Sequence, residues 1–462
     1  MQSLRRLQLT AMGAALAAAF GMSLPAHADT FGFNGYFRAG PGTTSNSSNG
    51  GSARQCYNLP GVDAGHYRLG NECNFYGEFG FNDYGSVGTA KYHNEVMINE
   101  YSPSTDIGKS SSSFEQMYGS VSGVDFAPEV HFWAGKRFYG RANIDMLDHF
   151  FVRMDGVGGG ADHIALGSGG AKLGLAYFGS DSYAGFGDGG NDLSQQSGRR
   201  FNVDVTDIPV NPGGTLRITG TLTKSNSVGG TSGDAISFQH NQKLPQIGGG
   251  NVLWVQYARG SASLAQNFGS SNSPTSAAAW RIADALDWQA GRFGGQANVV
   301  YGHHDAGATG NATGGTFTDA NNVTHALEYT NGAGIGTVAY TNSSLGARFT
   351  YALTGNLRVI GQFGHMTKKP NGMATETLNI ETIGLGIVPD AYKYYSRPEI
   401  RLYVTHGSWN QAAALDPANY AYNGDNGLAG ATFGVNGSGG YSGVSAGSTS
   451  GTSVGLQVEA WF

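Results

Sequence analysis

The C-terminal residues alternate between two kinds of side chain, and this alternation restricts the possible folds more than any other feature of the sequence. Val454, Leu456, Val458, Ala460 and Phe462 occupy one set of positions, and Gly455, Gln457, Glu459 and Trp461 occupy the other. Successive side chains of a β-strand point to opposite faces, so the segment predicts a strand with one apolar and one mostly polar face. Such a strand is typical of a wall between two different media.

The same period of two recurs along the chain, around residues 31–38, 74–81, 216–222 and 400–405. The sequence also has 75 Gly among 462 residues and only 13% charged residues. Each Gly costs about 1 kcal/mol relative to Ala inside a helix, so this composition disfavours a helical fold. The 40% of apolar residues are enough to bury a core and argue against disorder. We therefore expect a large all-β protein.

Three features favour a transmembrane antiparallel β-barrel over an exported soluble β protein, in which strands alternate as well. Polar Arg, Glu and Gln side chains occupy mid-strand positions on the second face, as a water-filled lumen allows. Aromatic residues recur near strand ends like the girdles of a membrane barrel, and the chain stops on such a strand; examples are Phe31, Phe33, Tyr257 and Phe462. Stretches rich in Gly, Ser and Asn are expected to form loops: residues 40–51, 156–170, 185–196, 225–233, 306–318 and 424–451.

Residues 1–28 are predicted to be a signal peptide, because a basic start and an Ala-rich apolar stretch precede Ala26-His27-Ala28. The remainder, 29–462, is expected to form a single domain. Export implies an oxidising compartment, so Cys56 and Cys73 are expected to pair. The formal net charge is −6 and no basic cluster follows the leader, which argues against a nucleic-acid partner.

Two motifs could carry chemistry, and each has a simpler interpretation. The segment Gly156–Gly160 lacks the following amphipathic helix that a phosphate-binding loop needs, so we expect a flexible loop. His303, His304 and Asp305 could bind a metal, but adjacent histidines in a polar loop usually meet solvent. No arrangement of residues singles out a catalytic nucleophile. We therefore expect no enzyme activity, no resident metal and no cofactor.

The polar face of the first and last strands is the stronger candidate for a site. Tyr36, Arg38 and Trp461 are predicted to face the lumen, and the two strands are neighbours in a closed barrel. Tyr76 and Glu78 would add a second inward pair. Aromatic rings beside charged groups suit sugars, whose C–H face stacks on a ring while their hydroxyls bind ionised side chains. The alternative, that these residues only fill the barrel or its girdle, has equal weight on this pattern alone.

Several ordered blocks of the sequence resemble the maltoporin family. They are Phe33-Asn-Gly-Tyr-Phe-Arg38, Tyr67-Arg-Leu-Gly-Asn-Glu-Cys73, Trp133-Ala-Gly-Lys-Arg-Phe-Tyr139, Asn211-Pro-Gly-Gly-Thr-Leu216, Ser396-Arg-Pro-Glu-Ile-Arg401 and Glu459-Ala-Trp-Phe462. The blocks span both ends and the middle of the chain, whereas residues 260–390 match poorly. The resemblance implies an 18-stranded barrel in the outer membrane of a Gram-negative bacterium. It also implies a homotrimer, surrounded by membrane lipid and lipopolysaccharide, that takes up oligosaccharides passively.

The resemblance also assigns roles to individual residues. An aromatic track that guides the sugar would comprise Tyr36, Tyr76, Trp461 and Phe150, and a flanking polar track would comprise Arg38, Arg68, Glu78, Arg141, Asp145 and Asp148. The loop around residues 141–151 would fold inward and narrow the pore. Cys56 and Cys73 would form the family's disulfide in the first outer loop.

The sequence departs from the family pattern at several positions of these tracks. Ile236 and Leu353 stand at two further positions of the aromatic track, and Phe150 replaces a tyrosine. Asn143 and Asp145 replace an acid and a histidine, and Glu115 stands where an arginine is expected. These changes predict a different sugar, a broader pore or weaker binding of long maltodextrins.

The sequence therefore predicts a porin for saccharides similar to maltose and maltodextrins. A general porin, or one for another substrate, is the alternative within the same class. An outer-membrane adhesin or receptor with a plugged lumen, and an outer-membrane hydrolase, are alternatives from other classes.

Overall fold

The computed structural model describes residues 30–45, 56–102, 110–180, 198–226, 229–271, 273–307, 316–318, 323–326, 338–415, 433–435, 441–444 and 449–462. The expected signal peptide, residues 1–28, and the expected loop at 185–196 lie outside these ranges. In the described part of the chain, no helix is long and apolar enough to cross a membrane.

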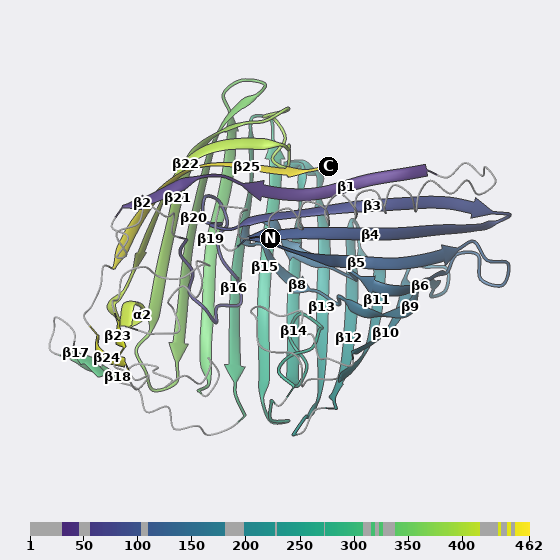
Figure 1. The fold of residues 1–462 in the computed structure, drawn as a ribbon, viewed down its shortest axis with the longest axis horizontal. Helices are drawn as coiled ribbons and strands as arrows, with labels where there is room; N and C mark the ends of the chain where they lie inside the picture. Colours follow the sequence, from purple (N-terminus) through teal and green to yellow (C-terminus); the bar gives the residue numbers. More distant parts are fainter. Residues whose placement is uncertain are drawn as a thin grey trace, which may run out of the picture.

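The described strands form a closed antiparallel barrel of 18 strands, as predicted, when β2 is counted as the continuation of β1 (Figure 1). The wall strands are β1 (Thr30–Ala39), β2 (Gly42–Ser45), β3 (Phe75–Val87), β4 (Ala90–Ser102), β5 (Ser111–Ser122), β6 (His131–Arg137), β9 (Gly156–Ala165), β10 (Lys172–Ser180), β11 (Gly198–Asn211), β12 (Gly214–Ser225), β13 (Ser232–Leu244), β14 (Gly249–Gly260), β15 (Ala278–Ala290), β16 (Phe293–Asp305), β19 (Tyr340–Ala352), β20 (Leu357–Pro370), β21 (Glu376–Ile387), β22 (Glu399–Trp409) and β25 (Ser450–Trp461).

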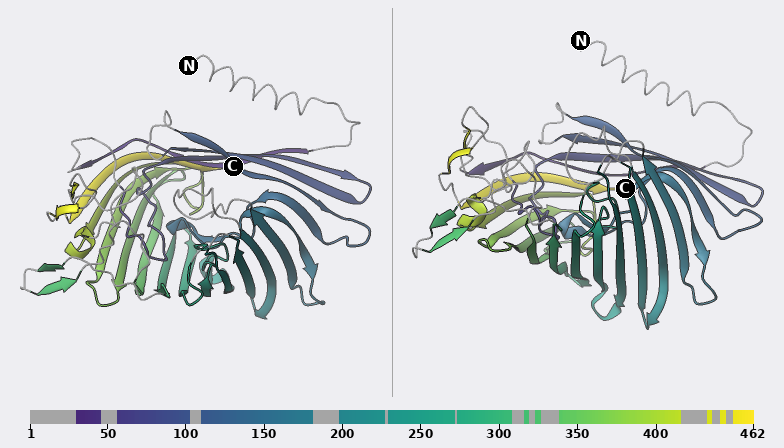
Figure 2. Two further views of the ribbon diagram at one scale, coloured as in Figure 1. Left: turned by 60° about the horizontal axis from the view of Figure 1, so that its bottom comes forward. Right: turned by 90° about the horizontal axis from the view of Figure 1, so that it is seen from below.

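The barrel closes where the first strand meets the last. Strand β1 pairs with β3 on one side and with β25 on the other, and β2 continues the pairing with β25. Closure leaves no unpaired sheet edge, which is the condition for a β-structure to span a membrane. Figure 2 shows the wall strands curving around a central space, with β1 and β25 running side by side.

Alternation along the strands separates an apolar outer face from a polar inner one. In β25, Val454 and Leu456 are 42% and 46% exposed, whereas Gln457 and Glu459 are fully buried. The aromatic residues expected in the girdles, Phe31, Phe33, Tyr257 and Phe462, are all exposed. The outer face is therefore suited to lipid and the inner face to water or a polar solute.

Successive connections alternate between two ends of the barrel. One end, here called the short-turn end, carries brief turns such as residues 88–89, 212–213 and 291–292, together with the 3-10 helix η3 (Pro245–Ile247). The other, the long-loop end, carries the connections that alternate with these along the chain. It includes the hairpins β17 (Thr316–Thr318) with β18 (Thr324–Ala326) and β23 (Phe433–Val435) with β24 (Tyr441–Val444), and the helix α2 (Gln411–Leu415).

The connection between β6 and β9 folds into the barrel, as expected for residues 141–151. It contains β7 (Ala142–Ile144), the 3-10 helix η2 (Asp145–Leu147) and β8 (His149–Val152). Met146, Leu147 and Phe151 are fully buried against side chains of the wall, and the ring of Phe151 stacks on Trp254 with centroids 4.6 Å apart. This segment is called the inward loop below.

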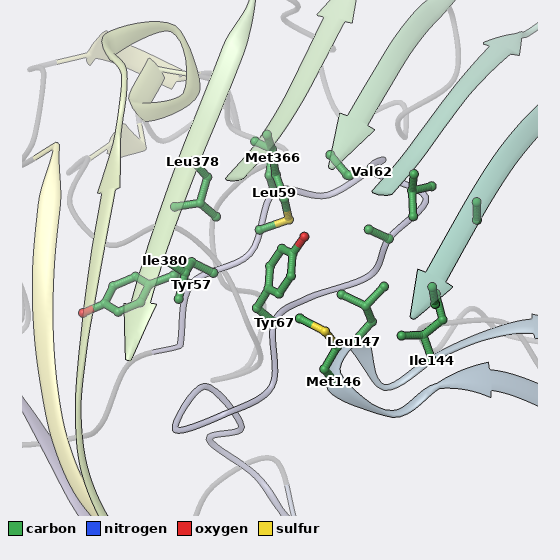
Figure 3. Close-up of a cluster of buried hydrophobic side chains, with 14 of the residues drawn as sticks. Tyr57, Leu59, Val62, Tyr67, Ile144, Met146, Leu147, Met366, Leu378 and Ile380 are labelled. Carbon is green, nitrogen blue, oxygen red and sulfur yellow. The ribbon is translucent and has the colours of Figure 1, made fainter. Parts of the chain in front are cut away.

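A second segment, residues 56–74, also enters the barrel, which the sequence did not predict. The expected disulfide is confirmed and ties its ends, because Cys56 and Cys73 are bonded. Tyr57 and Tyr67 are fully buried, and Figure 3 shows Tyr67 between Met366 of β20 and Met146 of the inward loop. The Tyr67 hydroxyl lies 2.6 Å from Ser344 Oγ of β19. The first connection is therefore a docked part of the pore, here called the first loop.

Two expectations about loops were wrong. Gly156–Gly160 begins strand β9, which pairs with β6. Its glycines leave room for the inward-facing rings of Trp133 and Phe178, because a Cβ at Gly158 would lie 2.8 Å from Phe178 Cδ1 and one at Gly160 would lie 3.1 Å from Trp133 Nε1. His303, His304 and Asp305 belong to β16, and His304 Nε2 lies 2.9 Å from Asp63 Oδ1 of the first loop instead of meeting only solvent. Both residue sets are stabilised by partners distant in sequence.

Candidate functional site

The seam of the barrel brings together three predicted aromatic residues, which lie on the end strands β1 and β25 and on the adjacent strand β3. Tyr36 of β1 lies directly opposite Trp461 of β25 and opposite Glu78 of β3. Arg38 lies opposite Tyr76 in the same pairing. The rings of Tyr36 and Tyr76 have centroids 6.2 Å apart. All three aromatic side chains are partly exposed and lie on the lumen-facing side of adjacent strands; together they are called the seam patch here.

Charged groups hold the seam patch in place. The hydroxyl of Tyr36 donates to Glu459 Oε1 at 3.1 Å and accepts from Arg68, while the hydroxyl of Tyr76 donates to Glu78. The guanidinium of Arg38 lies 5.4 Å from the Tyr76 ring centroid and 6.0 Å from that of Tyr36. Both tyrosine hydroxyls are thus hydrogen-bonded to protein groups. The faces of the rings are the part of these side chains that a solute can contact.

Most predicted polar residues lie beside this patch in one ionic cluster. Arg38 contacts Glu72 at 3.0 Å and Asp148 at 3.1 Å. Arg68 contacts Glu72 at 2.9 Å, Glu459 at 2.7 Å and Asp145 at 3.3 Å. Arg38 and Arg68 are only 8% and 4% exposed. Their charges therefore bind the first loop, the inward loop and β25 to one another.

Asp148 lies at the junction of this cluster, in the inward loop. Burial alone would raise the pKa of its carboxyl, but the positive charges of Arg68 and Arg38 outweigh burial and lower the pKa below its usual value. Asp148 is therefore ionised at neutral pH and fixes the inward loop to β1.

The remaining two predicted residues lie on the limbs of the inward loop. Arg141 donates to Asp155 Oδ2 through Nε at 2.8 Å. Phe150 lies near two guanidinium groups, with its ring centroid 4.8 Å from Arg141 and 5.4 Å from Arg153. Arg141 also interacts electrostatically with Glu78, which links this limb to the seam patch.

Two residues placed on the aromatic track by the resemblance do not face the lumen. Ile236 of β13 is 38% exposed and alternates with the buried, inward-facing Ala235 and Ser237. Leu353 follows β19 at the short-turn end and is 44% exposed, with Ala352 before it fully buried. A shift of one residue in the alignment of a strand moves every side chain to the opposite face. Such a shift in a weak match explains why Ile236 and Leu353 were wrongly placed on the aromatic track.

Sequence reasoning missed several residues that complete the site. The segment between β21 and β22 brings Tyr395 within 3.4 Å of Gln296 Nε2, and Arg397 lies over Trp461, 4.3 Å from its ring centroid. Arg401 contacts Glu459 at 3.0 Å and Glu399 at 3.1 Å. The alternation of apolar and polar residues at 400–405 predicts that Arg401 faces the polar side, so this pattern could have identified it as a residue of the site.

The ionic cluster also contains a set of atoms that resembles a metal site. His66, Glu72 and Asp148 offer donor atoms within 4.8 Å of one another. However, Arg38 Nη1 already contacts both carboxylates, and burial lowers the pKa of His66. The guanidinium groups occupy the place of a cation, so this set is not suited to a metal ion.

The contact between the inward loop and β15, which is made by His149 and Arg281, should depend on pH. Burial, and then the charge of Arg281 whose Nη1 lies 2.7 Å from His149 Nε2, lowers the pKa of His149 to about 3. Because the unfolded value is higher, the free energy of unfolding is highest above about pH 6.5 and falls by up to about 1.4 kcal/mol per pH unit below it.

This pH dependence can be measured by guanidinium unfolding in detergent at pH 7 and pH 4.5. His149→Gln should lose part of the acid destabilisation that the parent shows. His406→Gln, which changes an exposed histidine of β22, serves as the control and should behave like the parent. Equal acid destabilisation of His149→Gln and the parent would exclude this role.

One family model and several solved structures are similar to this chain. The family model for the LamB porin matches residues 31–462. OmpT of Vibrio cholerae is a similar solved structure, with 9% identity, coverage of 95% of this chain and 99% of that chain, and a TM-score of 0.40. OccK2 of Pseudomonas aeruginosa in complex with glucuronate has 10% identity, coverage of 94% and 98%, and a TM-score of 0.47. OprD of Pseudomonas aeruginosa has 10% identity, coverage of 94% and 93%, and a TM-score of 0.45. Because the family model spans nearly the whole barrel and includes both seam strands, the chain belongs to the LamB porin family.

Proposed function

We propose that this porin is a passive channel for neutral saccharides similar to maltose and maltodextrins. Its family indicates a channel in the outer membrane of a Gram-negative bacterium, with the short-turn end in the periplasm. By the same resemblance we propose a homotrimer. The choice of saccharides as substrate rests on the residues that line the lumen.

The observation that carries this proposal is the seam patch. Tyr36, Tyr76 and Trp461 lie on three adjacent strands with their side chains toward the lumen, and the hydroxyls of the two tyrosines are hydrogen-bonded to protein partners. An aromatic surface of this kind binds the C–H face of a pyranose ring. The ring of Tyr395, from the segment between β21 and β22, adds a further partly solvent-exposed aromatic.

Charged groups beside the rings supply the second part of sugar recognition. Glu78 and Asp148 are partly exposed next to the patch, and ionised groups form stronger hydrogen bonds with hydroxyls than neutral groups do. A channel needs binding that is strong enough to draw a solute in and weak enough to release it. A row of similar stacking sites meets this requirement, because the sugar exchanges one contact for the next.

A porin with a different or broader substrate range is the second candidate, and two observations favour it. The donors of Arg38 and Arg68 are directed at Glu72, Asp148 and Glu459, so fewer of them remain for sugar hydroxyls. Phe150 also lacks a hydroxyl. Weak sugar block with normal ion conductance would support this candidate.

Truncation of the seam patch tests the proposed function. Tyr36→Ala and Trp461→Ala should each slow maltotriose entry in proteoliposome swelling by about two- to tenfold, as expected for the loss of one stacking contact. Ion conductance should be unchanged or slightly higher. Tyr257→Ala removes an exposed aromatic of the outer face and is the matched control. If both seam variants swell at the rate of the control, these rings do not bind sugar.

A further inference from the structure

Strands β6 and β9 bring together three side chains that the sugar proposal does not use. His131, Asp162 and His163 each offer one donor atom, and these atoms lie within 4.8 Å of one another. His131 lies directly opposite Asp162 in the strand pairing. Asp162 Oδ1 is 2.5 Å from His163 Nδ1 and 3.7 Å from His131 Nδ1. Two imidazole nitrogens therefore converge on a single carboxylate oxygen.

A β-bulge produces this convergence. Ala161 pairs with Leu175 and Ile164 pairs with Leu173, so Asp162 and His163 together oppose one residue of β10. His163 has a φ of 62°, a conformation that few residues other than glycine adopt. Regular alternation would send consecutive side chains to opposite faces, but the bulge directs both to one face.

That face is the lumen. Asp162 Oδ2 accepts from Arg137 Nη1 at 3.2 Å, and the Arg137 guanidinium lies 5.1 Å from the ring centroid of the buried, inward-facing Trp133. The cluster lies near the short-turn end of the barrel, because His131 is the first residue of β6 and His163 lies near the end of β9. The cluster thus lies at the mouth of the pore.

We propose that His131, Asp162 and His163 form a binding site for a divalent transition-metal ion, with Zn²⁺ as the best match. Two imidazoles and one carboxylate form a donor set that Zn²⁺ prefers, whereas Ca²⁺ and Mg²⁺ prefer oxygen ligands alone. Bonds of about 2.0–2.1 Å place the donors of a tetrahedral zinc roughly 3.3 Å apart. The observed separations of 2.5 and 3.7 Å lie on either side of that value, so small side-chain rotations suffice.

The surroundings leave one ligand position open and orient the carboxylate. The side chains of His131 and His163 are 47% and 46% exposed, which leaves room for water as the fourth ligand. Arg137 binds Oδ2 and leaves Oδ1 directed at the two rings, as outer partners of metal ligands commonly do. The positive charge of Arg137 opposes a cation, so the affinity should be in the micromolar range.

A zinc ion in this place adds positive charge to the wall of the pore mouth. We therefore expect Zn²⁺ added from the short-turn side to reduce cation conductance, and to do so at lower concentration than from the long-loop side. This effect is independent of sugar binding at the seam patch, so the two proposals can fail separately.

The test is a titration of the metal-free, purified full-length mature protein in detergent with ZnCl₂ in competition with a chromophoric chelator. We expect one Zn²⁺ per chain. His131→Gln and His163→Asn should each weaken binding at least about tenfold, since changes even in outer partners cost that much. Asn tolerates the left-handed backbone of position 163, so that variant retains the bulge.

His240→Gln is the matched control, because His240 lies in the half of β13 near the same end and contacts Asn211. Its affinity should stay within a factor of two of the parent. The absence of micromolar zinc binding in the parent would overturn the proposal. Equal affinities of the parent and both cluster variants would place the zinc elsewhere and would overturn it as well.

Discussion

Replacing Glu459 with Ala should lower the free energy of unfolding by about 3–5 kcal/mol, because it leaves several buried guanidinium groups without their counter-ion. The Glu459 side chain is fully buried. Its carboxylate contacts Arg68 at 2.7 Å, Arg397 at 2.9 Å and Arg401 at 3.0 Å. These three residues come from the first loop, the turn before β22, and β22 itself, so one carboxylate joins three parts of the pore.

The measurement is guanidinium unfolding of the parent and variant in detergent micelles, followed by tryptophan fluorescence. Glu459→Gln keeps the volume and one acceptor and should lose less stability than Glu459→Ala. Asp234→Asn is the control, since Asp234 pairs with Arg259 at 2.6 Å but both side chains are exposed. Such exposed pairs contribute roughly 0–1 kcal/mol. Equal losses for Glu459→Ala and Asp234→Asn would show that the buried cluster does not stabilise the barrel.

Replacing Gly364 with Ala should displace the first loop and increase the single-channel conductance. A Cβ at position 364 would lie 2.0 Å from Tyr67 Cδ2, and one at Gly346 would lie 2.2 Å from Tyr67 Cε1. Because no left-handed backbone is involved at Gly364, the effect is steric alone. Overpacking of this kind typically costs about 1–3 kcal/mol. The displaced Tyr67 would also lose its hydrogen bond with Ser344.

A double-mutant cycle isolates this contact. Tyr67→Ala removes the ring that the new methyl group meets, so Gly364→Ala should have little further effect in that background. Gly220→Ala adds a methyl group where no atom lies within 4 Å and should leave conductance unchanged. Additive effects of Gly364→Ala and Tyr67→Ala would contradict the proposed packing.

Much of the barrel follows from the sequence because membrane and lumen impose opposite demands on alternate residues. Val454, Leu456, Gln457 and Glu459 carry that signal within a single strand, and the closure of any barrel then makes β1 and β25 neighbours. That Tyr36 and Trp461 face the lumen from neighbouring strands could therefore be predicted from the sequence, whereas their direct pairing is a finding of the structure.

The features that sequence reasoning missed depend on partners far away in the chain. Tyr67 docks against Gly364 and Gly346, and no local pattern in residues 56–74 indicates this. The run of glycines in β9 has the composition of a loop. Its role as a strand becomes clear only from the rings of Trp133 and Phe178 that pack against it. Ile236 was expected to face the lumen, but only its neighbours Ala235 and Ser237 do. A shift of one residue in the match to the family pattern moves a position to the opposite face of the strand. The contacts of Glu459 with three arginines likewise require the closed barrel.

The most direct test of saccharide passage is the ion conductance of single channels in a planar bilayer, titrated with maltose, maltodextrins and sucrose. We expect open channels, in steps of three if the protein is a trimer, that maltodextrins close reversibly and saturably at micromolar to millimolar concentration. Open channels that none of these sugars closes would contradict the sugar proposal and leave a porin of another specificity. A barrel that carries no current would contradict the open pore itself and favour an adhesin or receptor.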